Sequence, residues 1–259
     1  MSKVGRQYLI GLRARNCSEG DLVDGEQSQA IAKEDVLNEL HRLTVKLQSK
    51  SAASFTALQK SAAPLDPATT SSLEALKSFT AARHQTFSSR SQALLLFKRA
   101  IELDPEFAFA YAYLGRSYAD SGEQNLAVES IGQAYRLRGI ASDKENFFIT
   151  YNYDREALRN FELCREVCES WSARYPRDYV PHGFLSGLTS QGTAQYEKAI
   201  QEGEEAIVLA PDFTIGYQNI AEANLHLGRP EAAVKLCNGP PAENCRPAMR
   251  YGYNSSPLS

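Results

Sequence analysis

The side chains that could do chemistry in this chain are few and scattered. There are five cysteines and four histidines among 259 residues. Cys164 and Cys168 lie four apart on a predicted helix, so they share one face of it. A zinc site needs about four ligands close together, and the sequence supplies no further ligand near this pair. Two packed thiols are therefore favoured over a metal site, and no cofactor is predicted.

The histidines give no sign of catalysis either. His84, His182 and His226 stand at positions that recur along the chain, with no carboxylate or cysteine cluster near them in the sequence. Each is therefore expected to be neither a metal ligand nor a catalytic base. No Ser/His/Asp or Cys/His set, pair of carboxylates or metal-ligand spacing stands out. The sequence predicts that this chain is not an enzyme.

Composition and charge narrow the classes of partner. The 28 Lys and Arg residues against 31 Asp and Glu give a net charge of −3, without the basic excess that nucleic acid requires. No apolar run approaches the roughly 18 residues of a membrane helix. The stretch "YLIGL" is too short for a secretion signal and is followed by Arg13 and Arg15. With an odd, sparse set of cysteines, we expect a cytoplasmic protein with reduced thiols, which binds no nucleic acid and has no membrane segment.

The element that dominates the chain is a pair of amphipathic helices. In residues 111–135 the first helix places four residues on one face, at i, i+3, i+4 and i+7: Tyr111, Leu114, Gly115 and Tyr118. The letters "DSGEQ" then break the helix, with Gly122 suited to its C-terminal end. The second helix places three residues on one face: Ala127, Ile131 and Ala134. Because helices cross closely only where side chains are small, we expect Gly115 and Ala127 to let the two backbones approach.

The same order of residues recurs along the chain. Tyr217 follows Tyr111 by 106 residues, close to three repeats of about 34. Upstream, three residues take the places of the second helix: Ala93, Phe97 and Ala100. Three prolines are predicted to end second helices: Pro105, Pro176 and Pro211. The spacing predicts a stack of helical hairpins.

These features resemble the tetratricopeptide repeat (TPR) family, whose pattern is W-x2-L-G-x2-Y…A-x3-F…P. The matching letters here are "YAYLGRSY" with Ala127, and "FKRAIELDP". Repeats of about 34 residues give about five units over residues 74–237, the last of them incomplete. The unit at 145–176 departs from the pattern at four residues: Phe148, Tyr151, Cys164 and Trp171. "LRGIAS" at 137–142 lacks the closing proline, so we expect a longer or kinked turn there.

The first 50 residues follow a different pattern. Residues 8–14 alternate as a strand, with Tyr8, Ile10, Leu12 and Ala14 on one face; "SEGD" is a turn and "LVDGEQSQAIA" a second strand. An amphipathic helix follows, with five apolar residues facing inward: Val36, Leu37, Leu40, Leu43 and Leu47. Because a lone hairpin is marginal in water, we interpret residues 1–50 as a β-β-α remnant of a larger α/β domain.

Two further segments lack a helical period. Residues 51–73 are rich in Ser, Ala, Pro and Thr, which predicts a linker. Residues 238–259 hold four of the chain's 11 prolines and are predicted to be disordered. The last repeat would lose half of its hairpin there and expose an apolar face. A truncated or frame-shifted gene product is therefore suspected.

The combination resembles the C-terminal sensor region of large bacterial regulators, which are serine/threonine protein kinases and some winged-helix regulators of soil bacteria such as acidobacteria. The letters that carry the resemblance are "APLDPATTSSLEALK", "LFKRAIELDP", "DKENFFIT" and "YPRDYVPHGFLSG", within residues 8–237. The resemblance implies that residues 1–50 come from a TolB-like domain. The kinase elements would lie upstream, since this sequence has no Gly-rich phosphate loop, V-A-I-K lysine, H-R-D or D-F-G.

The repeats predict a protein–protein interaction module, and the resemblance to bacterial regulators implies that it is part of a signalling protein. Stacked hairpins form a superhelix whose concave face, lined by the first helices, binds an extended peptide or a partner helix. The candidate contact residues are the non-core positions of these helices: Tyr113, Arg116, Asp120, Tyr153, Phe184, Gln218, Asn219 and Glu222. Chaperone-binding members have a Lys and an Asn where this chain has Ala112 and Arg116, so the carboxylate ligand of those members is disfavoured.

Two other interpretations stay open. In the first, the chain is a fragment of a serine/threonine kinase whose catalytic domain lies upstream, and serves as its regulatory tail. In the second, it is a remnant without a selected function, which its abnormal ends favour. Upstream coding sequence tests the first, and thermal unfolding without a cooperative transition would support the second. The sequence does not determine the partner, the pathway or the oligomeric state.

Overall fold

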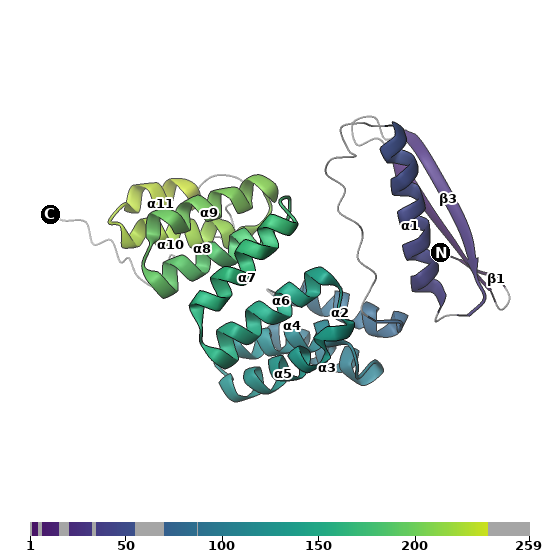
Figure 1. The fold of residues 1–259 in the computed structure, drawn as a ribbon, viewed down its shortest axis with the longest axis horizontal. Coiled ribbons are helices and arrows are strands. Elements are labelled where there is room, and N and C mark those ends of the chain that lie inside the picture. The colour runs from purple at the N-terminus through teal and green to yellow at the C-terminus, as the bar shows by residue number, and fades with distance from the viewer. Residues whose placement is uncertain are drawn as a thin grey trace. The chain divides into compact units, whose positions relative to one another are not determined.

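The computed structural model describes residues 2–4, 7–15, 21–32, 35–54, 70–86 and 88–237 (Figure 1). The tail at 238–259, predicted to be disordered, lies outside the described residues. So do most of the predicted "SEGD" turn and most of the predicted linker at 51–73. The chain divides into two compact units, Met1–Arg159 and Asn160–Ser259, and each has its own packing.

The N-terminal strands form an antiparallel sheet in the order β1-β2-β3. β1 spans Ser2–Val4, β2 spans Gln7–Arg15 and β3 spans Leu22–Ala30. In the register, Leu9 of β2 pairs with Ser2, and Tyr8 pairs with Ala30. β2 and β3 are the two predicted strands. The prediction missed β1, because a strand of three residues is too short to show an alternating pattern.

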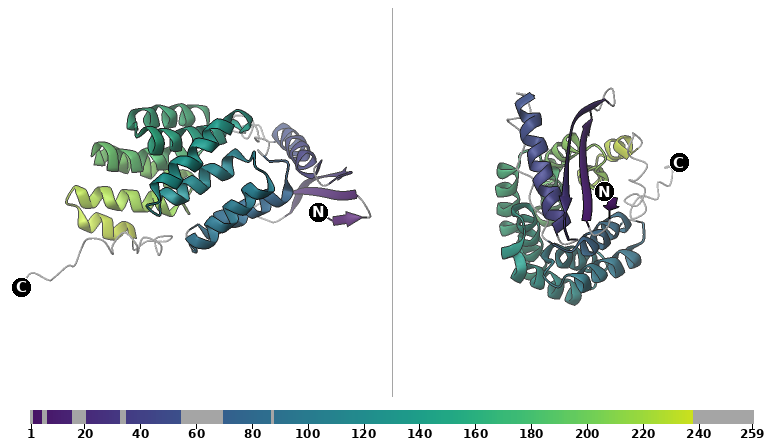
Figure 2. Two further views of the ribbon diagram at one scale, coloured as in Figure 1. Left: turned by 90° about the horizontal axis from the view of Figure 1, so that it is seen from below. Right: turned by 90° about the vertical axis from the view of Figure 1, so that its right-hand side faces the viewer.

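Helix α1, Asp35–Ser54, lies along one face of this sheet (Figures 1 and 2). The core between sheet and helix contains four buried residues, two of them from the predicted inward face of α1: Ile10, Ala30, Val36 and Leu43. The opposite face of the sheet carries exposed polar side chains, among them Arg13, Gln27 and Gln29. An antiparallel sheet with one polar face needs cover on its other face only, and α1 provides it.

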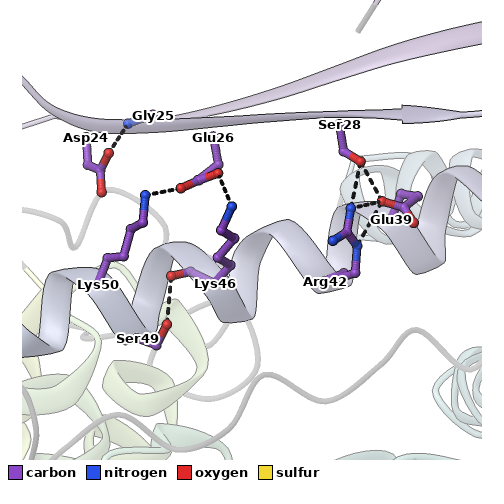
Figure 3. Close-up of polar contacts among 9 residues, drawn as sticks. All are labelled: Asp24, Gly25, Glu26, Ser28, Glu39, Arg42, Lys46, Ser49 and Lys50. Carbon is purple, nitrogen blue, oxygen red and sulfur yellow. Dashed lines mark hydrogen bonds and ion pairs between the residues drawn. The ribbon is translucent and has the colours of Figure 1, made fainter.

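Polar side chains hold α1 in place along β3 (Figure 3). Lys46 and Lys50 both pair with Glu26 of β3, and Lys46 Nζ lies 2.8 Å from Glu26 Oε2. Nearer the start of α1, Arg42 donates a hydrogen bond of 2.8 Å to Ser28 Oγ. The hydrogen bonds from Lys46 and Lys50 lower the pKa of Glu26. The carboxylate of Glu26 is therefore charged although little of it is exposed, and the two lysines balance its charge.

Helices in sequence order make up the rest of the first unit. α2 (Leu73–Gln85) pairs with α3 (Arg90–Leu103), and α4 (Ala108–Ala119) pairs with α5 (Gln124–Leu137). α6 (Asp143–Tyr153) packs against α4 and α5. α2–α3 and α4–α5 are thus two helical hairpins of the kind that the sequence predicted.

Gly115 and Ala127 lie where α4 and α5 pack together, as predicted. Both residues are buried, and a Cβ at Gly115 would stand 3.0 Å from the backbone oxygen of Ala127. Gly122, just after α4, has a φ of +80°, a conformation that glycine adopts without steric cost. The small residues therefore set the distance between the helices, and the glycine turns the chain.

The junction between α5 and α6 confirms the predicted longer turn. A 3-10 turn, η1, spans Arg138–Ile140 directly after α5. Ser142 then starts α6 with a capping box: its side chain accepts from Glu145 N, and the Glu145 side chain accepts from Ser142 N. The reciprocal bonds satisfy backbone donors that the first turn of a helix leaves unpaired.

The second unit contains the remaining described helices. They are α7 (Phe161–Arg174), α8 (Tyr179–Thr193), α9 (Tyr196–Leu209), α10 (Thr214–His226) and α11 (Pro230–Cys237). α7 packs on α8, α8 pairs with α9, and α10 pairs with α9 and α11. The prolines predicted to end second helices all lie two residues beyond one: Pro105 after α3, Pro176 after α7 and Pro211 after α9.

The division between the units falls inside the predicted repeat at 145–176, whose sequence departs from the TPR pattern. α6 belongs to the first unit and α7 to the second. Between them lie a π-helical turn, η2 (Asp154–Leu158), and Arg159 with a φ of 52°. The fold is thus mainly α, with TPR-like helical hairpins preceded by a small sheet and helix.

Candidate functional site

In each compact unit, one pair of neighbouring helices aligns residues that the sequence predicted as contact residues. α4 contacts α6 in the first unit, and α8 contacts α10 in the second. Two surfaces are defined here by the predicted contact residues that these helices carry. The α4/α6 surface consists of Tyr113, Arg116, Asp120 and Tyr153, and the α8/α10 surface of Phe184, Gln218, Asn219 and Glu222.

Tyr113 is half-buried in an aromatic cluster that joins neighbouring hairpins. Its ring stacks on Phe148 of α6, with centroids 4.7 Å apart and planes at 9°. Phe79 of α2 meets the same ring edge-on at 5.3 Å, and the Arg83 guanidinium lies 5.2 Å from its centroid. Much of this ring therefore serves packing, and a ligand could meet only its remaining part.

Arg116 is held in place by side chains on either side. Its Nε lies 3.6 Å from Asp120 Oδ1 one turn along α4. Its Nη1 donates to Asn152 Oδ1 of α6 at 3.5 Å, and Asn152 is fully buried and donates to Phe148 O at 2.7 Å. The side chain of Arg116 is 24% exposed and that of Asp120 44% exposed. The pair therefore presents oriented charges of both signs to solvent.

Tyr153, the other member of this surface, is directed at α5. Its ring stacks on Tyr135 with centroids 3.9 Å apart and planes at 10°. The Arg138 guanidinium lies 3.7 Å from the centroid of Tyr135. The Tyr135 ring therefore contacts both this cation and the ring of Tyr153. The structure thus brings Arg116 and Asp120 together and gives Tyr153 a packing contact of its own.

The α8/α10 surface combines packing residues with presented ones. Phe184 meets Trp171 of α7 edge-on, with centroids 6.1 Å apart. Asn219 is buried and donates from Nδ2 to Gly183 O of α8 at 3.2 Å, which ties α10 to α8. Gln218 is half-buried. Glu222 is 44% exposed and lies 4.0 Å from His226, so this surface presents an acidic and an amide group.

An ion pair that the sequence did not indicate joins α8 to α9. His182 Nδ1 lies 2.9 Å from Glu202 Oε2, and both side chains are about four-fifths buried. The hydrogen bond to Glu202 raises the pKa of His182, while burial acts in the opposite direction. The two residues are 20 apart in sequence, so only the hairpin brings them together. The nearby carboxylates of Glu205 and Asp178 act in the same direction as Glu202.

This pair predicts a pH-dependent contribution to stability. Because the pKa of His182 is raised in the folded state, the contribution is complete below the unfolded pKa of about 6.5 and is lost as pH rises through the folded pKa. We expect His182→Gln to lose about 1 kcal/mol of unfolding free energy at pH 5.5 and clearly less at pH 8.5. Urea denaturation across this range measures the difference. His84→Gln on α2 is the control. A loss of unfolding free energy in His182→Gln that is the same at every pH would contradict the proposed contribution of the His182–Glu202 pair.

The two cysteines on α7 lie in the core. Cys164 and Cys168 are fully buried thiols, and burial raises the pKa of the Cys168 thiol. Neither thiol is therefore suited to be a nucleophile. Within the described ranges, no group of three His, Cys, Asp or Glu side chains could hold a metal ion. In the same part of the chain, no helix is both long and apolar enough to span a bilayer.

A polar network around the π-helical turn was likewise not evident from the sequence. Gln124 Nε2 of α5 donates to Glu156 Oε2 at 3.1 Å, and Arg155 Nε lies 3.3 Å from Glu156 Oε1. Asp154 is 5% exposed, and no side-chain partner for it occurs among the residues that the structure describes. Burial raises the pKa of Asp154. The π-helical turn therefore contains both the bonded pair Arg155–Glu156 and the buried carboxyl group of Asp154.

Comparison with known proteins finds solved structures that are similar at low sequence identity. No protein-family model matches it. The MamA protein is 21% identical over 63% of this chain and 87% of its own, with a TM-score of 0.35. Cut9–Hcn1 of the APC/C is 20% identical over 64% of this chain and 32% of its own, with a TM-score of 0.45. A thermophilic TPR protein of Thermus thermophilus is 18% identical over 68% of this chain and 99% of its own, with a TM-score of 0.48.

Proposed function

We propose that this chain is a protein–protein interaction module that binds a peptide or a partner helix on the first helices of its hairpins. The observation that carries the proposal is the side-by-side packing of α4 with α6 and of α8 with α10. Adjacent first helices align their non-core side chains in rows. A row of this kind can bind an extended peptide or a helix through several weak contacts.

The α4/α6 surface gives the proposal its most specific element. Arg116 and Asp120 are partly exposed and hold each other in orientation. A preorganised guanidinium loses less conformational freedom on binding than a mobile one. Arg116 is therefore proposed as the principal contact of this surface, and Asp120 as its neighbour. Gln218 and Glu222 take the corresponding roles on the α8/α10 surface.

Charge reversal at Arg116 tests the proposal. We expect Arg116→Glu to weaken binding of a selected peptide at least about tenfold, because a charge-assisted contact becomes a repulsion at roughly 1.4 kcal/mol per tenfold change. Peptides are first selected from a random 12-residue display library on the immobilised wild-type chain. Fluorescence polarisation then gives the dissociation constant, and circular dichroism gives the melting temperature of each variant.

Arg99→Glu is the matched control for this measurement. Arg99 lies on the second helix α3, is 59% exposed and pairs with Glu102. The same charge reversal there leaves the α4/α6 surface untouched, so peptide affinity is expected to stay as in the wild type. If both variants lost peptide affinity equally, the change in net charge would explain the loss, and no specific contact of Arg116 would be shown. An unchanged affinity of Arg116→Glu would remove Arg116 from the site.

The biological setting belongs to the same proposal. The resemblance of residues 8–237 to the C-terminal region of bacterial regulators supports a regulatory role in a cytoplasmic signalling protein. The alternative is that the chain is part of a serine/threonine kinase whose catalytic domain lies upstream. Sequencing the locus before Met1 separates the two. An in-frame kinase domain supports the alternative, and a promoter directly before Met1 supports an independent adaptor.

A further inference from the structure

Strand β3 forms an edge of the N-terminal sheet. In the described part of the chain the sheet has the order β1-β2-β3, so β3 pairs with β2 on one side and with no strand on the other. β3 spans Leu22–Ala30, which is longer than most strands of globular proteins. The unpaired N–H and C=O groups of such an edge are a template for pairing with another chain. The open edge of β3 is therefore a candidate interaction surface.

The backbone groups that face the open edge belong to every second residue. The N–H of Gly25 donates to Asp24 Oδ1 at 2.7 Å (Figure 3) and is therefore directed away from β2. In an antiparallel ladder, residues that bond to a given neighbouring strand alternate with residues that point away from it. Gln27 and Gln29 follow Gly25 at intervals of two, so their N–H and C=O groups also point to the open edge. The side chains of both glutamines are exposed.

The side chains on the α1 face of the sheet limit how two copies of β3 can pair. Glu26 lies on this face, where it bonds to α1. An antiparallel pair of complete β3 strands would place Glu26 directly opposite Glu26 of the second copy, and like charges in that position are destabilising. A shift that centres the pair on Gln27 is the smallest one that avoids this conflict. It keeps residues 24–30 paired and places Glu26 opposite the Ser28 hydroxyl of the second copy.

The cations of α1 fit the same register. Arg42 donates to Ser28 Oγ at 2.8 Å, and its side chain is 62% exposed. Because Ser28 would stand opposite Glu26 of the second copy, Arg42 brings a positive charge next to that carboxylate. Lys46 and Lys50 pair with Glu26 within each copy. The two Glu26 carboxylates beside the two-fold axis would therefore each be surrounded by cations.

The position of α1 also leaves room for a second copy. α1 packs on Ile10 of β2 and on Ala30 of β3, so it lies above the space between these strands. Neighbouring strands are about 4.8 Å apart, so a two-fold axis midway between the two β3 strands lies about 5 Å from the axis of α1 in the plane of the sheet. The two α1 helices would then lie about 10 Å apart, close to the usual distance between packed helices.

We propose that two copies of this chain associate through β3, as an antiparallel pair centred on Gln27. The pair forms one sheet of the order β1-β2-β3-β3-β2-β1, and the two α1 helices cover the same face of it. The interface uses no residue of the α4/α6 surface or the α8/α10 surface. It therefore does not depend on the peptide or helix that those surfaces bind.

The mass of the chain in solution gives the first test. Sedimentation equilibrium should show an assembly with twice the mass of the 28.7 kDa chain, which dissociates on dilution. Gln27→Pro should raise the dissociation constant at least about tenfold, because the N–H at the centre of the pair is lost from both copies. Proline is tolerated in an edge strand where the N–H faces solvent, and circular dichroism checks that the variant is folded. Gln27→Thr keeps the N–H and is the matched control, with an expected dissociation constant close to that of the wild type.

Disulfide trapping tests the register. The chain used has serine in place of Cys17, Cys237 and Cys245. In this chain Gln27→Cys should give a disulfide-linked dimer under mild oxidation, because directly opposite residues of a bonded pair have Cα atoms about 5.5 Å apart, within the reach of a disulfide. Gln29→Cys is the matched control. Its two new thiols would lie four residues apart along the strands, roughly 13 Å, which is too far for a disulfide.

Three results would overturn the proposal. The first is a wild type that keeps the mass of one chain at the highest soluble concentration. The second is a dimer that Gln27→Pro and Gln27→Thr leave equally stable, since the two copies would then meet elsewhere. The third is trapping of Gln29→Cys as readily as Gln27→Cys, or trapping of neither. A dimer that Gln27→Pro weakens and that only Gln27→Cys traps supports the proposal.

Discussion

Replacing Gly115 with alanine is expected to lower the free energy of unfolding by about 1–3 kcal/mol, the range observed for overpacking a closely packed core. A Cβ at Gly115 would stand 2.5 Å from Ile131 Cγ1 and 3.0 Å from two backbone atoms, Ala127 O and Ile131 N. A side chain can change its rotamer, but the backbone of α5 can only move away as a whole. The loss therefore exceeds the gain of about 1 kcal/mol that alanine brings over glycine in a helix.

Gly132→Ala is the matched control for this substitution. Gly132 lies in α5, and a Cβ there would meet only Arg136 Nη1, at an ordinary contact distance of 3.8 Å. We expect this variant to be more stable by up to about 1 kcal/mol, because alanine is the better helix former. Urea denaturation followed by circular dichroism measures both variants. Changes of the same sign would contradict the proposed role of Gly115 in the close approach of α4 and α5.

Asp154→Asn is expected to stabilise the chain by about 1 kcal/mol at pH 7, the free energy that corresponds to roughly one pKa unit, because it removes a charge that is buried without a partner. Asp154 is 5% exposed, and the described residues offer its carboxylate no hydrogen bond or ion pair. Asparagine has nearly the same shape but carries no charge. The variant therefore removes the desolvation of a carboxylate while the packing of the π-helical turn stays the same.

The stabilisation by Asp154→Asn is expected to increase with pH. Burial raises the pKa of Asp154 in the folded state, so the folded chain keeps its proton at pH values where the unfolded chain has released it. The destabilisation is absent below the unfolded pKa of about 3.9 and grows as pH rises through the folded pKa. The stabilisation by Asp154→Asn should accordingly be small at acid pH and complete at neutral pH.

Asp212→Asn provides the control for this effect. Asp212 is exposed in the loop before α10, so the same change of charge should alter the free energy of unfolding by less than about 0.5 kcal/mol. Thermal unfolding from pH 4 to pH 8 measures the stability of Asp154→Asn and of Asp212→Asn. A stabilisation by Asp154→Asn that is the same at every pH would show that the charge of Asp154 is not the cause.

The sequence by itself determined the hairpins and their ends. The period of apolar and small residues identified the contact faces of α4 and α5, including Gly115 and Ala127. Gly122 marked a turn that needs a positive φ, and Pro105 marked the end of α3. These features could be predicted because helix faces, turns and helix ends depend on residues within a few positions of one another.

Only the tertiary structure decided how the candidate site is assembled. Arg116 meets Asn152 across 36 residues, and His182 meets Glu202 across 20 residues. Packing between helices selects such partners, and a helical period says which face a residue occupies but not what lies opposite. Tyr113, predicted as a contact residue, is for this reason largely engaged with the rings of Phe79 and Phe148.

The division of the chain was likewise a decision of the tertiary structure. The sequence showed that the repeat at 145–176 departs from its pattern, but the letters "DREALRN" contain no glycine or proline to mark a break. Around the π-helical turn, Gln124 and Arg155 both bond to Glu156, and Asn160 caps the next helix. Sequence periodicity therefore determined which helices exist, because that information is local. Contacts between distant residues decided where the stack divides and which side chains its surfaces present.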